Sequence, residues 1–139
     1  MLKIFSDFED QGYVLTRSGL IRNDSNIVDK LDTTECNDPD FLKLMERLPL
    51  LYKKTNKTCT ITSYKLKHHY QIFYDQYISN GQFILAMLMN DFVLNLKKFS
   101  QLNVVFKMTP IYKIVSKDGK QFLQISISIN DFKQLLKCK

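Results

Sequence analysis

The segment FILAMLM at residues 83–89 constrains the fold most, because its side chains are apolar on every side of a helix. Ser79 and Gln82 have the spacing of a capping box, in which the serine side chain accepts from the third amide and the glutamine reaches back to the capping residue. We therefore expect a helix from about residue 81 to 99. A helix that is apolar all round is buried. This segment therefore predicts the centre of the core.

A second helix is expected just before the first, and together they would form a helical hairpin. Ser63 is a suitable N-cap, and an apolar stripe follows at spacings of four, three and four, made by Leu66, Tyr70, Phe73 and Tyr77. A shorter helix should begin at Asp38, with Pro39 at its first position, and end at Pro49. Its apolar face is expected to consist of Phe41, Leu42, Met45 and Leu48.

The two ends of the chain indicate strands. Short strands are expected at residues 2–5, 13–16 and 20–22, and an acidic loop with room for one helical turn at 23–38. Strands at 104–108 and 112–116 lead to Asp118-Gly119, the dipeptide of a type I′ hairpin turn. The alternation of Leu123, Ile125, Ile127 and Ile129 then predicts a half-buried strand, and Asn130 can cap a last helix ending near residue 137.

These elements predict one α+β domain over residues 1–139, with a central helical hairpin whose buried second helix packs on a small antiparallel sheet. The seven-residue apolar run is too short to cross a membrane. We expect no signal peptide, because Asp7, Glu9 and Asp10 interrupt the first ten residues before an apolar run can form. Three cysteines at irregular spacing do not form a disulfide framework, which favours a reducing cytoplasm.

Charge is distributed unevenly along the chain. Residues 1–51 hold six Lys or Arg against ten Asp or Glu, whereas residues 52–139 hold fourteen against four. No carboxylate occurs between Glu46 and Asp75, a window that contains both histidines. Basic side chains without neighbouring acids leave their charge available to an anionic partner. We therefore expect a non-enzymatic protein that binds nucleic acid or a nucleoprotein complex. The expected contact residues are Lys53, Lys54, Lys57, Tyr64, Lys65, Lys67 and His68.

The alternative is a protein-binding inhibitor or adaptor that contacts a host protein through the acidic residues Asp29, Asp32 and Glu35. Standard helix-turn-helix docking is disfavoured, because the second helix begins with apolar rather than base-reading side chains. The cysteines and histidines lack the close pairs of a zinc site, and no acid accompanies Cys59 and His68 as a nucleophile pair would require. We expect no metal and no cofactor.

Residues 62–88 also resemble a module of small phage and mobile-element proteins of unassigned function. The module has the pattern S-Y-x-x-K-H-x-x-E, a spacer, then Y-[IV]-S-N-G-x-[FL]-I-x-A. The matching residues here are Ser63, Tyr64, Lys67, His68, Tyr77, Ile78, Ser79, Asn80, Gly81, Phe83, Ile84 and Ala86. Gln71 stands in the place of the glutamate. The resemblance implies a mobile-element origin, and with it a DNA-handling accessory or an inhibitor of a host defence complex.

Overall fold

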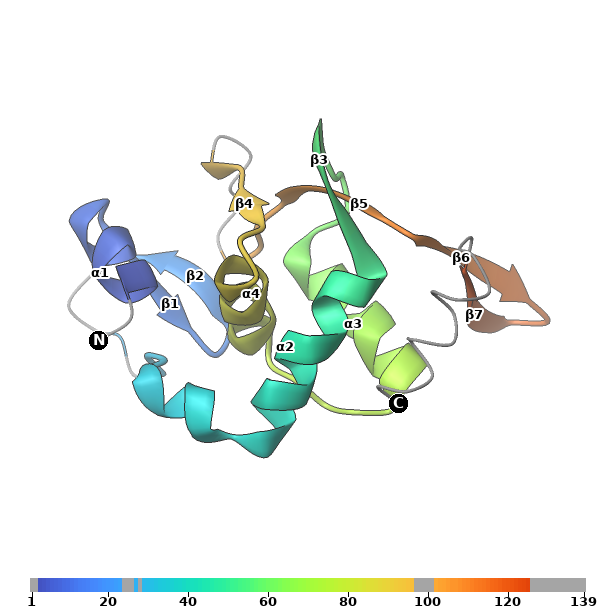
Figure 1. Ribbon diagram of the computed structural model, residues 1–139, viewed down its shortest axis with the longest axis horizontal. Helices are drawn as coiled ribbons and strands as arrows, with labels where there is room; N and C mark the ends of the chain where they lie inside the picture. Colours follow the sequence, from blue (N-terminus) through green and yellow to red (C-terminus); the bar gives the residue numbers. More distant parts are fainter. Residues whose placement is uncertain (1–2, 24–26, 28, 97–101, 126–139) are drawn as a thin grey trace.

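The computed structural model describes residues 3–23, 27, 29–96 and 102–125, and these form an α+β fold, as the sequence predicts (Figure 1). In this part of the chain, four α-helices are combined with three small antiparallel sheets instead of the single sheet expected. None of its helices has the length and apolar character needed to cross a bilayer.

Helix α4 (Asn80–Met89) lies at the centre of the fold (Figure 1). It contacts α2 (Pro39–Leu51), α3 (Ser63–Tyr74) and the hairpin of β1 (Tyr13–Thr16) and β2 (Gly19–Arg22). All five side chains at positions 83–87 are fully buried. The capping box is confirmed, because the Gln82 amide donates to Ser79 Oγ at 3.1 Å and the Ser79 amide donates to Gln82 Oε1 at 3.0 Å.

Helix α4 ends ten residues earlier than expected, and its last turn explains why. Asp91 adopts a left-handed conformation with φ of 65°, and its amide donates to the Leu88 carbonyl. The Phe92 amide donates to the Met87 carbonyl. This is the Schellman pattern, which glycine usually closes and aspartate closes here. The short strand β4 (Val93–Leu94) follows.

The first element is a helix, α1 (Lys3–Asp10), and the expected strand at residues 2–5 is therefore wrong. Phe5 and Phe8 are buried on one side of it, a spacing typical of a helix rather than of a strand. The strands expected at 13–16 and 20–22 are confirmed by β1 and β2. The helical turn within the acidic loop is η1 (Thr33–Asn37), which Asp32 caps.

Helix α2 continues through Pro49 to Leu51, so the prediction that Pro49 ends this helix is wrong. Proline lacks the amide that would donate to the carbonyl four residues earlier, that of Met45. The Asn90 side chain supplies a donor instead, with Nδ2 lying 3.1 Å from the Met45 carbonyl oxygen. Leu42 was expected on the apolar face of this helix, but it is half exposed. Leu44 is buried there instead.

The central sheet has the order β3 (Tyr52–Thr58), β5 (Phe106–Pro110), β4. Tyr52 pairs with Pro110 and starts a strand that the sequence did not indicate. The register shifts between Lys54 and Thr58, which leaves residues 55–57 as a bulge. The ring of Tyr52 packs edge-to-face on that of Phe83, and the two centroids lie 6.2 Å apart. This contact joins the sheet to α4.

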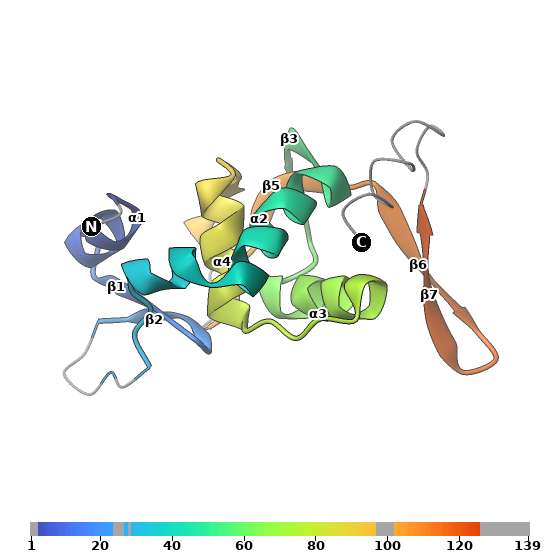
Figure 2. The same ribbon diagram turned by 60° about the horizontal axis from the view of Figure 1, so that its bottom comes forward.

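The last described element is a hairpin of β6 (Tyr112–Lys117) and β7 (Lys120–Ile125), which extends from the body (Figure 2). Its turn is of the predicted type I′, since Asp118 and Gly119 have φ of 54° and 77°. The expected strand residues Ile127 and Ile129, and the helix expected from Asn130, lie outside the described residues.

Candidate ligand pocket

A pocket of about 710 Å³ lies where α3, the start of α4 and the β1–β2 turn meet. We call it the tyrosine pocket. Its main lining residues are Arg17, Tyr64, Lys67, His68, Tyr77 and Asn80. No Asp or Glu belongs to the lining that the structure describes. Pockets of this size can hold a small-molecule ligand or one unit of a polymer.

Helix α3 supplies three of the lining side chains from its first two turns. Ser63 was predicted to be the N-cap of this helix, and that prediction is wrong. Thr62 is the N-cap, while Ser63 Oγ accepts from the Val104 amide at 3.1 Å and fastens α3 to the segment before β5. Tyr64 and His68 are one turn apart, and their rings meet edge-on with centroids 4.6 Å apart. Tyr64 remains half exposed.

Lys67 is the most unusual residue of the pocket, because only 6% of its surface is exposed. Its ammonium lies 5.3 Å from the ring centroids of both Tyr64 and Tyr77, within the range of cation–π attraction. Nζ also donates to Gln71 Oε1 at 3.2 Å. Neither ion pair among the described residues includes Lys67. Burial lowers the pKa of its ammonium below the ordinary value, and no carboxylate in the described part of the chain compensates the charge.

The far wall of the pocket is built from the connection between α3 and α4. Gln71 Oε1 accepts from the Ile78 amide at 3.3 Å and so fixes this connection to α3. Asn80 Nδ2 donates to the carbonyls of Ser18 and Leu102 at 2.9 and 3.0 Å. Because Ser79 and Asn80 line the pocket, the N-terminus of α4 borders it, and the helix dipole is positive at this end.

Gly81 makes the close approach of α4 to the β1–β2 turn possible. Its amide donates to the Arg17 carbonyl at 3.0 Å. A Cβ atom at this position would lie 1.8 Å from the Thr16 carbonyl oxygen, which no side chain can accommodate. This contact brings Arg17, which the sequence did not indicate as a site residue, to the pocket. Its guanidinium pairs with Glu35 Oε1 at 2.8 Å.

The structure divides the seven predicted contact residues. Tyr64, Lys67 and His68 line the tyrosine pocket, whereas Lys65 is exposed on α3 and absent from the lining. Lys53, Lys54 and Lys57 are exposed on β3. Lys53 and Lys54 border a separate depression, where the Lys54 ammonium lies 5.4 Å from the centroid of the Phe92 ring.

Tyr77 was expected on the buried stripe, but 77% of its surface is exposed. The reason is that α3 ends at Tyr74, where Asp75 takes a left-handed conformation with φ of 51°. Tyr77 therefore lies in the connection and its ring borders the pocket. Leu66 and Tyr70 are buried as expected, and Phe73 is partly buried.

The acidic residues of the alternative prediction are placed differently from one another. Asp29 and Asp32 are exposed, and hydrogen bonds from the side chain and amide of Thr34 lower the pKa of Asp32. Glu35 is buried and accepts from Arg17 and from Gln82 Nε2. Asp29 and Asp32 are therefore the members of this set that a protein partner could reach.

The adjacent histidines of α3 face different surroundings. Burial, followed by the Lys67 charge, lowers the pKa of His68 below its ordinary value. His69 is buried, and its Nδ1 lies 3.0 Å from the Tyr112 hydroxyl at the base of the β6–β7 hairpin. Burial is also the main cause that lowers the pKa of His69, with smaller effects from Lys65 and His68. His68 therefore belongs to the pocket and His69 to the core.

No protein-family model matches this chain, and neither the curated proteins nor the solved structures contain a match to it. Any function must therefore be inferred from the chemistry of the site.

Proposed function

We propose that this protein is a small non-enzymatic accessory protein that binds nucleic acid, alone or in a nucleoprotein complex, and holds an unpaired segment at the tyrosine pocket. The observation that carries the proposal is Lys67, a buried cation that lies between two accessible tyrosine rings and has no carboxylate partner among the described residues. A phosphate would supply the missing counter-charge.

The remaining chemistry of the pocket supports the same class of ligand. Stacking of a base on an exposed ring stabilises single-strand binding by about 1–3 kcal/mol, and it tolerates any base. Tyr77 and Tyr64 offer such rings. His68 and the positive end of α4 add weaker attraction for an anion. An unpaired strand combines a phosphate with an accessible base, whereas the bases of a duplex are stacked inside it.

The experiment measures binding of a labelled single-stranded oligonucleotide by fluorescence anisotropy at several salt concentrations. Gln71→Glu places a carboxylate where the Lys67 ammonium already donates, and the side chain keeps nearly the same shape. We expect an affinity loss of about tenfold, equal to about 1.4 kcal/mol. Lys67→Met removes the cation and should make the negative slope of log K against log salt shallower by about 0.7.

The control variants make the same two changes of side chain at residues outside the pocket. Gln11→Glu and Lys43→Met alter exposed residues outside the pocket and should leave affinity within about twofold of wild type. Circular dichroism and thermal melts establish that each variant is folded. If folded Gln71→Glu and Lys67→Met bind as tightly as the controls, the pocket is not the binding site. If the wild-type protein has no affinity for nucleic acid, the proposal fails and a contact through Asp29 and Asp32 takes its place.

A further inference from the structure

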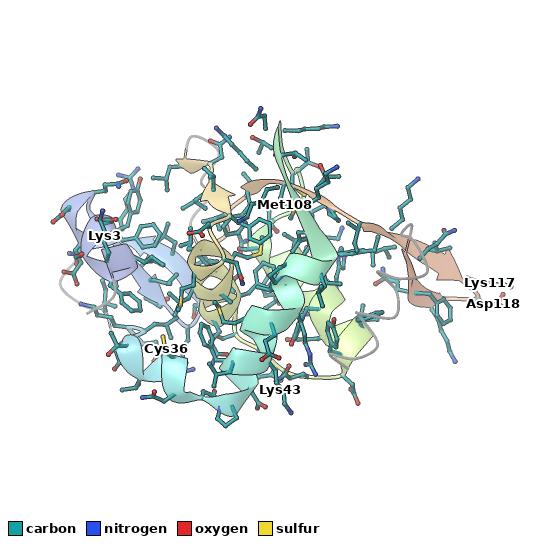
Figure 3. The ribbon with its side chains drawn as sticks, viewed as in Figure 1. Lys3, Cys36, Lys43, Met108, Lys117 and Asp118 are labelled. Carbon is teal, nitrogen blue, oxygen red and sulfur yellow. The ribbon has the colours of Figure 1, made fainter. Side chains whose placement is uncertain are left out.

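The β6–β7 hairpin forms an arm that is attached to the body at one end (Figures 1 and 2). At its base, the buried Tyr112 hydroxyl lies 3.0 Å from His69 Nδ1 and 3.4 Å from the Tyr52 hydroxyl. Among the described residues, the two strands pair only with each other. Lys117 and Asp118 lie at the outer end, on the opposite side of the molecule from Lys3 of α1 (Figure 3).

One face of this arm has an unusual composition. Side chains alternate between the two faces of a strand, so the register places Lys113, Val115 and Lys117 on the same face as their partners Gln124, Phe122 and Lys120. All six residues are exposed. Phe122 exposes 51% of its surface and Val115 exposes 39%. This face therefore combines three lysines and an apolar pair without an acid.

Neither the lysines nor the apolar pair on this face stabilises the protein by itself. Lys117 and Lys120 lie directly opposite one another, and like charges in that position are destabilising. Lysines on an edge strand can prevent aggregation, but the exposed Val115–Phe122 pair would promote it. A partner that is anionic and also offers apolar contacts accounts for both features.

We propose that this face of the arm enters the major groove of B-form DNA. The groove is about 12 Å wide and admits a two-stranded ribbon. Six residues at about 3.4 Å each span about 20 Å, the length of about six base pairs. Lysines can bind phosphates or guanine edges, and Gln124 can bind an adenine edge. Val115 and Phe122 are suited to contact with thymine methyl groups.

Nucleic-acid geometry makes the proposal selective. The major groove of A-form RNA is deep and too narrow for side chains to read. The arm should therefore bind duplex DNA and not duplex RNA. This inference does not rest on the proposed function of the tyrosine pocket, because the arm and the pocket use different residues and different forms of nucleic acid.

The test compares duplex DNA with duplex RNA of the same sequence by fluorescence anisotropy across a salt series. The double variant Lys117→Gln/Lys120→Gln should lower the salt slope for duplex DNA by about 1.8. Phe122→Ser should weaken binding to duplex DNA about fivefold, because the exposed half of the ring would no longer contact the DNA. The same variant should leave the salt slope unchanged. Lys3→Gln/Lys43→Gln removes two exposed lysines of α1 and α2 and should retain the wild-type slope.

Several results would overturn the proposal. One is equal affinity for the two duplexes, and another is a Lys117→Gln/Lys120→Gln variant that binds duplex DNA like the Lys3→Gln/Lys43→Gln control. A third is a dimer that Phe122→Ser dissociates without changing DNA affinity, since the arm would then contact a second copy of the chain. Lys67→Met separates this inference from the proposed function, because it should weaken single-strand binding and leave duplex binding unchanged.

Discussion

Replacing Asn90 by alanine should destabilise this protein more when residue 49 is proline than when residue 49 is alanine. Pro49 has no amide proton, so the Met45 carbonyl receives no helical hydrogen bond. The Asn90 side chain donates to that carbonyl at 3.1 Å and to the Ala86 carbonyl at 3.0 Å. In the Pro49→Ala background the alanine amide can donate to Met45 instead, and Asn90 becomes less important.

The expected size of this coupling follows from the number of bonds lost. Asn90→Ala removes both side-chain hydrogen bonds, at about 1 kcal/mol each, and should cost about 2 kcal/mol when Pro49 is present. In the Pro49→Ala background, the bond to Ala86 is the one that is lost without replacement, and the cost should be about 1 kcal/mol. The coupling free energy is therefore about 1 kcal/mol, which corresponds to about 4 °C in melting temperature.

Urea denaturation of the wild type, the two single variants and the double variant measures this cycle. Equal denaturant slopes across the four proteins would establish that the midpoints report stability. If Asn90→Ala costs the same in both backgrounds within about 0.3 kcal/mol, then Asn90 does not replace the missing amide of Pro49.

Three further predictions concern the core and the pocket. Gly81→Ala should cost about 3 kcal/mol in urea denaturation, because its Cβ would overlap the Thr16 carbonyl, whereas Gly12→Ala, which meets no atom within 4 Å, should cost about 1 kcal/mol for its positive φ. Burial lowers the pKa of His69 below 6.5, so the unfolded chain takes up the proton first. The free energy of unfolding should therefore fall as the pH drops through 6.5, and His69→Gln should reduce that fall in urea titrations at different pH. The pKa of His68 is also lowered, and a bound phosphate would raise it, so oligonucleotide affinity measured by anisotropy should increase below pH 6.5 and not in His68→Gln. An increase that persists in His68→Gln would assign the pH dependence to another group.

Elements defined by local chemistry could be predicted from the sequence. The Ser79–Gln82 capping box and the Asp118-Gly119 turn are where they were expected, because each depends on residues within one turn of the chain. The end of α4 was missed because aspartate, rather than glycine, takes the left-handed position at residue 91. The end of α2 was missed because its compensation for Pro49 comes from Asn90, forty-one positions away.

The candidate site was partly predictable for the same reason. Tyr64, Lys67 and His68 share one side of a helix, and helical spacing places them together. Arg17 joins them through the close approach at Gly81, a tertiary contact without a local signal. Conversely, Lys53, Lys54 and Lys57 of the acid-free window lie on β3, and none of them lines the pocket.

Helix α3 has a consequence for avidity. Tyr64 and Lys67 on this helix line the tyrosine pocket, and His69 holds the base of the arm. A rigid helix fixes the separation of two contacts without the entropy cost of a flexible linker. If the pocket and the arm bind as proposed, a nucleic acid with an unpaired segment beside a duplex would bind bivalently, and helix α3 would set its preferred length of unpaired strand.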